Sequence, residues 1–275
     1  MNTPTLHDAG PSHKKPRLAR WIIAIGLSAG TTLMAATAAP AQDDPARKIL
    51  KAMSDYVGSQ KNLSVTFDSD IEIITLELQK LQFTSSGQFT LSRPDKLRAS
   101  RTGGYNDVEF IFDGKTFTVN DRDDKAYAQA EGVSTVDQLV QKLRNEFSVE
   151  APGADLLLTS SYAALTEDVV DAKHIGQGVI DGMECEHLAF RSAETDWQIW
   201  VQTGPNPIPR KYVITSKAVT GGPQYTLRIK EWRTDPQIAA NTFSFTAPAG
   251  ARKVDFRALA HTDEVPAATA IGASK

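Results

Sequence analysis

The chain has 275 residues, of which 41% are hydrophobic, and a formal net charge of −3 at pH 7. This hydrophobic content is ordinary for a globular protein and is enough to form a buried core. The mildly acidic balance argues against nucleic acid as a partner, because nucleic-acid binding depends on clustered positive charge.

The first 41 residues have the three parts of a secretory signal peptide. An uncharged stretch at 21–39 is followed by Ala39-Pro40-Ala41, the small residues that a signal peptidase reads. A basic segment precedes this stretch and contains Lys14, Lys15, Arg17 and Arg20. We therefore predict a cleavable Sec-type signal at 1–41 and a periplasmic location. An uncleaved membrane anchor is the alternative, because the stretch is near the length that spans a bilayer.

The first element predicted in the mature chain is an amphipathic helix. Asp44 is a suitable N-cap, and Pro45 fits the first helical position, where its missing N–H costs nothing. Apolar residues then recur at helical spacing as far as Val57, and Gly58 is a suitable C-terminal stop,.

A series of strands follows from Leu63 to Gln129. Apolar residues alternate with polar ones from Leu63, which predicts a half-buried strand,. The alternation slips by one residue between Ile73 and Ile74, and we predict a β-bulge or a bend there. Asp113-Gly114 predicts a hairpin turn between two later strands.

Helices are predicted in the middle of the chain and strands in its last third. Ser134 with Asp137 resembles a capping box at the start of one helix. Pro152 is a candidate start for a second helix, which would carry the apolar residues of 156–165. Asp181-Gly182 predicts another hairpin, and four strands follow between 184 and 233,.

This order predicts an α+β fold, in which a strongly curved antiparallel sheet, a half-open β-barrel, has helices covering its concave face. We expect one domain, residues 42–256, followed by a disordered tail at 257–275. Apolar residues on the first two strands are predicted to line the concave face and to bind a ligand: Phe67, Ile71, Ile73, Phe83 and Phe89.

Several short segments of the sequence resemble known families of exported proteins. Ser92–Arg98 and Phe112–Thr116 resemble strand and hairpin segments of periplasmic lipoprotein-carrier-like proteins, the LolA/LolB superfamily. A second set is similar to domain of unknown function 2092: Asp181-Gly182, Cys185, His187–Phe190, Asp196–Trp200 and Pro209–Tyr212. The resemblance spans roughly 44–256. It implies a LolA-like unclosed barrel with a helical lid and an apolar cavity, in a superfamily whose carriers bind lipoprotein acyl chains or other amphiphiles.

Catalytic and metal-binding patterns are weak. Cys185 is the only cysteine, so no intramolecular disulfide can form; we expect it to be a small buried residue, with pairing between chains as the alternative,. Cys185 and His187 would lie about 6–7 Å apart along a strand, too far for a direct hydrogen bond. His174 and His187, with Glu184 or Glu186, are too few ligands for a convincing zinc site.

Two further patterns have structural explanations. Asp121, Asp123 and Asp124 lack the spacing of a calcium loop and predict a solvated turn. Trp197 and Trp200 are three residues apart on a strand and should lie on opposite faces, with core packing favoured over a ligand-lining role.

We therefore expect a monomeric, non-enzymatic periplasmic protein without metal or cofactor, which binds a lipid, a lipoprotein acyl chain or another amphiphile. Two alternatives stay open. One is an envelope sensor or scaffold whose cover helices bind another protein. The other is a hydrolase that uses His187 with Cys185 or a nearby carboxylate.

Overall fold

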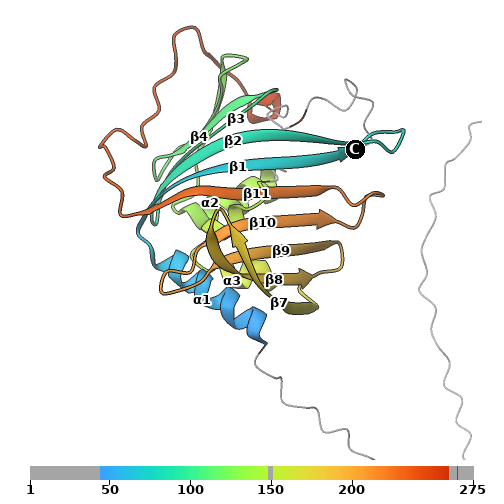
Figure 1. Ribbon diagram of the computed structural model, residues 1–275. Helices are drawn as coiled ribbons and strands as arrows, with labels where there is room; N and C mark the ends of the chain where they lie inside the picture. Colours follow the sequence, from blue (N-terminus) through green and yellow to red (C-terminus); the bar gives the residue numbers. More distant parts are fainter. Residues whose placement is uncertain (1–43, 148–150, 260–264, 266–275) are drawn as a thin grey trace, which may run out of the picture. The chain divides into compact units, whose positions relative to one another are not determined.

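The computed structural model describes residues 44–147, 151–259 and 265 (Figure 1). The predicted signal peptide lies outside the described residues, as does most of the predicted tail. Among the helices that are described, none is both long and apolar enough to cross a membrane.

The described strands form one 12-stranded sheet in the order β12-β6-β5-β4-β3-β2-β1-β11-β10-β9-β8-β7. Neighbouring strands pair antiparallel, apart from the short parallel pair β12–β6. The strands are β1 (Asn62–Ile74), β2 (Lys80–Ser92), β3 (Lys96–Gly103), β4 (Asp107–Phe112), β5 (Phe117–Asp121), β6 (Ala126–Ala130), β7 (Asp171–Ile180), β8 (Met183–Arg191), β9 (Thr195–Gln202), β10 (Pro209–Ser216), β11 (Gln224–Thr234) and β12 (Arg252–Lys253). Because β12 and β7 stand at opposite ends of this order, the sheet is open, as predicted.

Helical segments cover one face of the sheet, here called the inner face (Figure 1). They are α1 (Pro45–Ser59), α2 (Val136–Phe147), α3 (Ser161–Thr166) and the 3₁₀ turns η1 (Ala154–Leu157) and η2 (Phe256–Leu259). Helix α1 packs on β7, β8 and β9 and buries Leu50, Met53 and Val57 in the core. Its start is as predicted, since the N–H of Ala46 donates to Asp44 Oδ1 at 3.0 Å,.

The predicted bulge is in the wrong place. The β1–β2 register runs without a shift through Ile73 and Ile74, and the irregularity lies between Thr66 and Phe67, where β1 pairs with β11. The apparent slip in the sequence arises because Ile74, at the end of β1, is buried on the other face of the sheet beside Gly221. A contact with Gly221, which is distant in the sequence, rather than a bulge therefore accounts for the consecutive apolar residues.

The helical middle of the chain also differs from prediction. Thr135, not Ser134, caps α2, because Thr135 Oγ1 accepts from the N–H of Gln138 at 3.2 Å. The second predicted helix is split into η1 and α3. Gly153, with a φ of +85°, precedes η1, and Leu158 leaves it in an extended conformation,.

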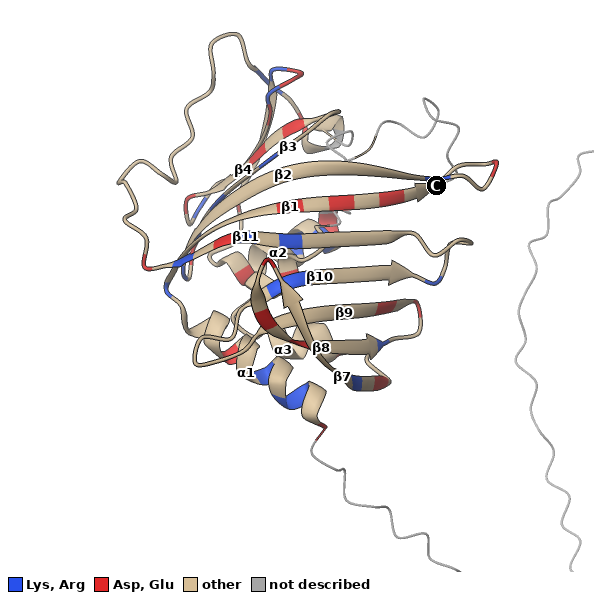
Figure 2. Cartoon of the chain, in the orientation of Figure 1, with Lys and Arg blue, Asp and Glu red and all other residues tan. Residues whose placement is uncertain are grey.

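The other face, here called the outer face, is polar over β1, β2 and β11. Asp68 lies 3.5 Å from Lys230, and Asp70 accepts a hydrogen bond from Thr84. Figure 2 shows the acidic bands of β1 beside basic bands of β11. Opposite charges that are interspersed in this way are typical of a solvated face.

The β7–β8 hairpin bends over this outer face (Figure 1). Asp181, in the turn of the hairpin, bonds to Arg228 of β11, although β9 and β10 separate these strands in the sheet order. Cys185, in β8 of this hairpin, is fully buried, as predicted.

Candidate functional site

The five residues predicted to bind a ligand lie on one face of the β1–β2 hairpin. The register pairs Val65 with Phe89, Phe67 with Gly87, and Ile71 with Phe83. Side chains of paired residues project to the same face, and positions two apart share it. Val65 and Phe89 belong to the core beneath the helices, so this is the inner face.

The core divides these five residues into two groups. Phe89 is buried within the core, and Phe67 and Ile71 pack against its edge. The ring of Phe67 lies over Gly87, which has no side chain to occupy that space. Ile73 and Phe83 lie farther along the strands, are half-buried and are not members of the core cluster. The apolar surface thus continues beyond the part that the helices seal.

We call this continuation the open end of the inner face: Ile71, Ile73, Leu81, Phe83 and Tyr105. Leu81 pairs with Ile73 on the inner face, and Tyr105 contacts Phe83 edge to face with ring centroids 5.2 Å apart. Tyr105 is 58% exposed, and two more leucines, Leu76 and Leu78, are 67% and 69% exposed in the adjoining β1–β2 turn. Large apolar side chains so clustered and exposed mark an interaction surface.

The predicted ligand-binding set omits Leu81 and Tyr105. Leu81 shares the alternation of Phe83 and Phe89, so its placement was available from the pattern. Tyr105 follows two glycines in the β3–β4 turn, where no periodicity indicates a face. Only the antiparallel register, which pairs Ser85 with Gly103, brings that turn beside Phe83.

Two hollows in the described part of the chain lie away from this apolar surface. A hollow of about 440 Å³ lies among polar residues of β3–β5, and one of about 310 Å³ lies beside α2. Neither is lined by any of the five predicted residues. Apolar side chains of α1, α2 and η1 belong to one core with the strands of the inner face.

The thiol does not have the surroundings of a nucleophile. Burial raises the pKa of the Cys185 thiol, which keeps it protonated at neutral pH,. His187 is engaged elsewhere, since it hydrogen-bonds Gln198 at 2.9 Å and stacks on Trp200 with ring centroids 4.1 Å apart. These contacts argue against a catalytic Cys185–His187 pair.

The two histidines also do not face each other. His174 bonds Glu186 at 2.6 Å, and the register places His174 opposite Leu188 rather than His187. The irregularity between His174 and Gly176 displaces the strand at this point. Among the residues that the structure describes, no group of three or more His, Cys, Asp or Glu side chains is arranged to hold a metal ion.

The tryptophans lie on opposite faces, as predicted. Trp197 is buried on the inner face and stacks on Phe190 with centroids 4.0 Å apart. Trp200 lies on the outer face between His187 and Lys211, whose ammonium group is 5.1 Å from the ring centroid. Trp200 is therefore part of the layer beneath the β7–β8 hairpin, away from the inner face.

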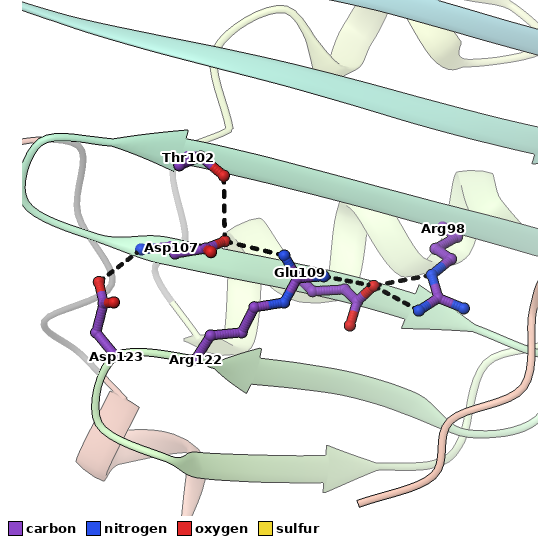
Figure 3. Close-up of polar contacts among 6 residues, drawn as sticks. All are labelled: Arg98, Thr102, Asp107, Glu109, Arg122 and Asp123. Carbon is purple, nitrogen blue, oxygen red and sulfur yellow. Dashed lines mark hydrogen bonds and ion pairs between the residues drawn. The ribbon is translucent and has the colours of Figure 1, made fainter. Parts of the chain in front are cut away.

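A polar network on the outer face of β3 and β4 was also missed (Figure 3). Glu109 Oε1 accepts from Arg98 Nε at 2.8 Å and from Arg98 Nη2 at 2.6 Å, and Arg122 Nη2 lies 3.0 Å away. Arg122 also bonds Asp107, and the N–H of Asp107 donates to Asp123. Asp123 thus lies in the β5–β6 turn and is tied by this hydrogen bond to the start of β4.

Comparison with solved structures gives partial resemblances. A conserved protein from Thermus thermophilus is 11% identical, with a TM-score of 0.46 over 77% of this chain and 99% of that one. LprF from Mycobacterium bovis is 11% identical, with a TM-score of 0.43 over 73% of this chain and 98% of that one. The Pseudomonas aeruginosa MucA/MucB complex gives 12% identity and a TM-score of 0.41 over 74% of this chain, which spans 62% of the matched chain.

Sequence comparisons are more decisive about the family. No curated protein sequence matches the chain. Residues 46–257 match the family described as "Predicted periplasmic protein (DUF2092)", a range that includes all of the described strands and most of the described helical residues. The chain therefore belongs to this family, as the resemblance of its sequence segments predicted.

Proposed function

We propose that this protein is a non-enzymatic periplasmic binder of a hydrophobic or amphiphilic molecule, either a lipid or an acylated protein. The observation that carries the proposal is the open end, where half-buried Ile73, Leu81 and Phe83 extend the core surface toward exposed Tyr105. An acyl chain laid along this surface would complete the burial of these side chains.

The energetic gain of such binding is moderate. Fully burying a Leu- or Phe-sized side chain contributes about 1.5–3 kcal/mol relative to its exposed state. The half-buried residues therefore contribute about 0.5–1 kcal/mol each, and the exposed Leu76, Leu78 and Tyr105 about 1–2 kcal/mol each. Together these terms offset part of the cost of association, and displacement of the helices would add further apolar surface.

Native mass spectrometry of the mature chain, purified gently from the envelope with a parallel lipid extraction, tests the proposal. We expect a bound amphiphile that is lost on unfolding. Phe83→Asp should lower retention at least about tenfold, because it removes apolar contact and places a charge against the hydrocarbon. Gln88→Asp, on the exposed outer face of the same strand, is the matched charge control.

Two outcomes would contradict the proposal. The first is a native protein that reproducibly shows only its apo mass. The second is a folded Phe83→Asp protein that retains as much amphiphile as the Gln88→Asp control.

A sensor or scaffold that binds another envelope protein is the second candidate function. It is favoured by β7, an edge strand with exposed Ile175 and Val179, rather than by the cover helices, which bury their apolar residues. Unpaired edge strands can add a strand from another chain. Val179→Lys should then abolish a complex isolated from envelope extract and leave amphiphile retention unchanged; a complex that survives this substitution would exclude the β7 edge.

A further inference from the structure

Two turns at one end of the sheet carry exposed apolar side chains (Figure 1). Leu76 and Leu78, in the β1–β2 turn, are 67% and 69% exposed, and Val219, in the β10–β11 turn, is 38% exposed. The two turns are neighbours, because a Cβ atom at Gly221 would lie 3.0 Å from Cδ1 of Ile74. We call Leu76, Leu78 and Val219 the apolar tip.

Hydrogen bonds hold the β1–β2 turn in a fixed conformation. The N–H of Thr75 donates to the carbonyl of Gln79 at 2.9 Å, and the N–H of Leu78 donates to the carbonyl of Thr75 at 3.0 Å. Thr75 Oγ1 also accepts from the N–H of Gln79 at 3.1 Å. These bonds close the turn within residues 75–79, and both of its leucines remain exposed.

The backbone conformation of Leu78 is unfavourable for a leucine. Its φ is +64°, in the left-handed region, where a Cβ atom crowds the following carbonyl oxygen,. Glycine or asparagine would adopt this φ at a lower cost and would expose less apolar surface. Residues held in such sparsely populated regions concentrate at functional sites. A strained and exposed leucine at this position therefore points to an interaction of its side chain.

The charges beside the apolar tip do not favour an anionic partner. Lys80 Nζ lies 2.9 Å from Glu72 Oε2. Lys217 Nζ lies 3.3 Å from Asp196 Oδ1. Glu77, between the two leucines, makes no ion pair with any residue that the structure describes. Because both lysines have carboxylate partners and Glu77 adds a negative charge, the attraction that the tip offers is apolar rather than electrostatic.

The surroundings of the tip fit a lipid bilayer. The hydrogen bonds of the β1–β2 turn satisfy their backbone groups internally, as an apolar environment requires. A turn also offers no open strand edge to which another chain could add a strand. Beyond the turn, Ile73 and Leu81 form the cross-strand pair that leads from the tip to the open end of the inner face. The apolar surface is therefore continuous from the tip to the residues proposed to hold an amphiphile.

We propose that the apolar tip docks this protein transiently on the surface of a lipid bilayer. Docking would hold the open end against the source or the destination of an amphiphile, and in that respect the inference rests on the proposed function. The three side chains offer less apolar surface than one myristoyl chain, which alone gives only marginal and reversible binding. The complex should therefore be short-lived, and its detection needs a method that is sensitive to small bound populations.

Paramagnetic relaxation enhancement of the amide NMR signals of the mature chain detects such a complex. Phosphatidylcholine nanodiscs carry a gadolinium-chelating lipid, and the same nanodiscs with lutetium are the reference. We expect the largest enhancement at residues 76–78 and 219. It should persist when NaCl rises from about 0.05 M to about 0.5 M, where surface electrostatics are screened. Phosphatidylglycerol in the nanodiscs should not increase it.

Substitutions in the β1–β2 turn test the role of its leucines. Leu78→Asn should lower the enhancement at least about fivefold, because burial of a mostly exposed leucine changes affinity by about that factor or more. Tm should stay unchanged or rise, since asparagine tolerates a positive φ. The matched control is Ile175→Ser with Val179→Ser, which removes two exposed apolar side chains from β7 and should leave the enhancement at the tip unchanged.

Phe83→Asp separates docking from amphiphile retention. It should lower retention in native mass spectrometry and leave the enhancement at residues 76–78 intact, because Phe83 is not part of the tip. Enhancement at the tip of a native protein that holds no amphiphile would overturn only the proposed function. Retained amphiphile without enhancement at the tip would overturn only the docking.

Three further outcomes would overturn the docking proposal. They are enhancement that is centred on β7 or spread evenly over the surface, enhancement that disappears at the higher salt concentration, and a fall in Tm for Leu78→Asn with enhancement retained. The last would show that Leu78 stabilises the fold rather than a complex with lipid.

Discussion

Gly87 provides a sharp test of how the inner face is packed. A Cβ atom at residue 87 would lie less than 3.0 Å from three carbons of the Phe67 ring. The backbone of Gly87 does not adopt a positive φ, so alanine is not strained there by its own conformation. The effect of Gly87→Ala should therefore come from displacement of the Phe67 ring.

Two opposing effects set the change in the free energy of unfolding that Gly87→Ala causes. Overpacking a buried contact costs about 1–3 kcal/mol, and the cost falls toward the lower limit when a side chain can swing aside. Gly→Ala also restricts the unfolded chain and stabilises by about 0.4–1 kcal/mol at a compatible site. We expect a net loss of about 1–2 kcal/mol for Gly87→Ala alone. In a Phe67→Ala background the same change should be neutral or stabilising.

Urea unfolding followed by tryptophan fluorescence measures this double-mutant cycle. The coupling energy between positions 67 and 87 should be about 1–2 kcal/mol, with an unchanged m-value. An equal effect of Gly87→Ala in both backgrounds would refute the packing argument. It would also remove Phe67 from the surface that leads to the open end.

Three further predictions concern the helix start, the thiol and the β7–β8 hairpin. Asp44→Ala should lower the free energy of unfolding by about 1 kcal/mol because it removes the N-cap of α1; an unchanged urea midpoint would contradict this. Cys185 should react with a thiol reagent at pH 7 only as fast as the protein unfolds, since burial raises the pKa of its thiol,; rapid labelling of the folded protein would revive the hydrolase hypothesis. The hydrogen bond from Arg228, together with its charge, lowers the pKa of the Asp181 carboxyl. This pair should therefore stabilise the hairpin above the ordinary Asp pKa of about 4 and lose its contribution as pH falls through the lowered folded-state value. Asp181→Asn should flatten that part of the stability curve in urea titrations, and a curve parallel to that of the native protein would exclude the pair as its cause.

Local sequence patterns were sufficient to predict an element where one type of interaction dominates. The cap at Asp44 and the alternation from Leu63 predicted α1 and β1, because helix capping and half-burial leave direct signatures in sequence,. The same alternation correctly placed Phe67 and Phe83 on one face. It failed at Ile74, whose burial depends on Gly221, a residue far along the chain.

The open end and the outer-face hollow required the tertiary structure. Tyr105 reaches Phe83 only through the antiparallel register of β2 and β3. The hollow on the outer face forms where residues 244–249 come beside Glu109 and Asn120. Neither of these long-range contacts is marked by a local pattern in the sequence.

By itself, the sequence determined that this chain forms a curved antiparallel sheet with helical cover and belongs to a family of predicted periplasmic proteins. Periodicity and turn residues carry that information because they act over a few neighbouring residues. The tertiary structure decided where the apolar face stays accessible and where residues 244–249 come beside β4 and β5. Those properties depend on contacts between distant segments, which no local spacing encodes.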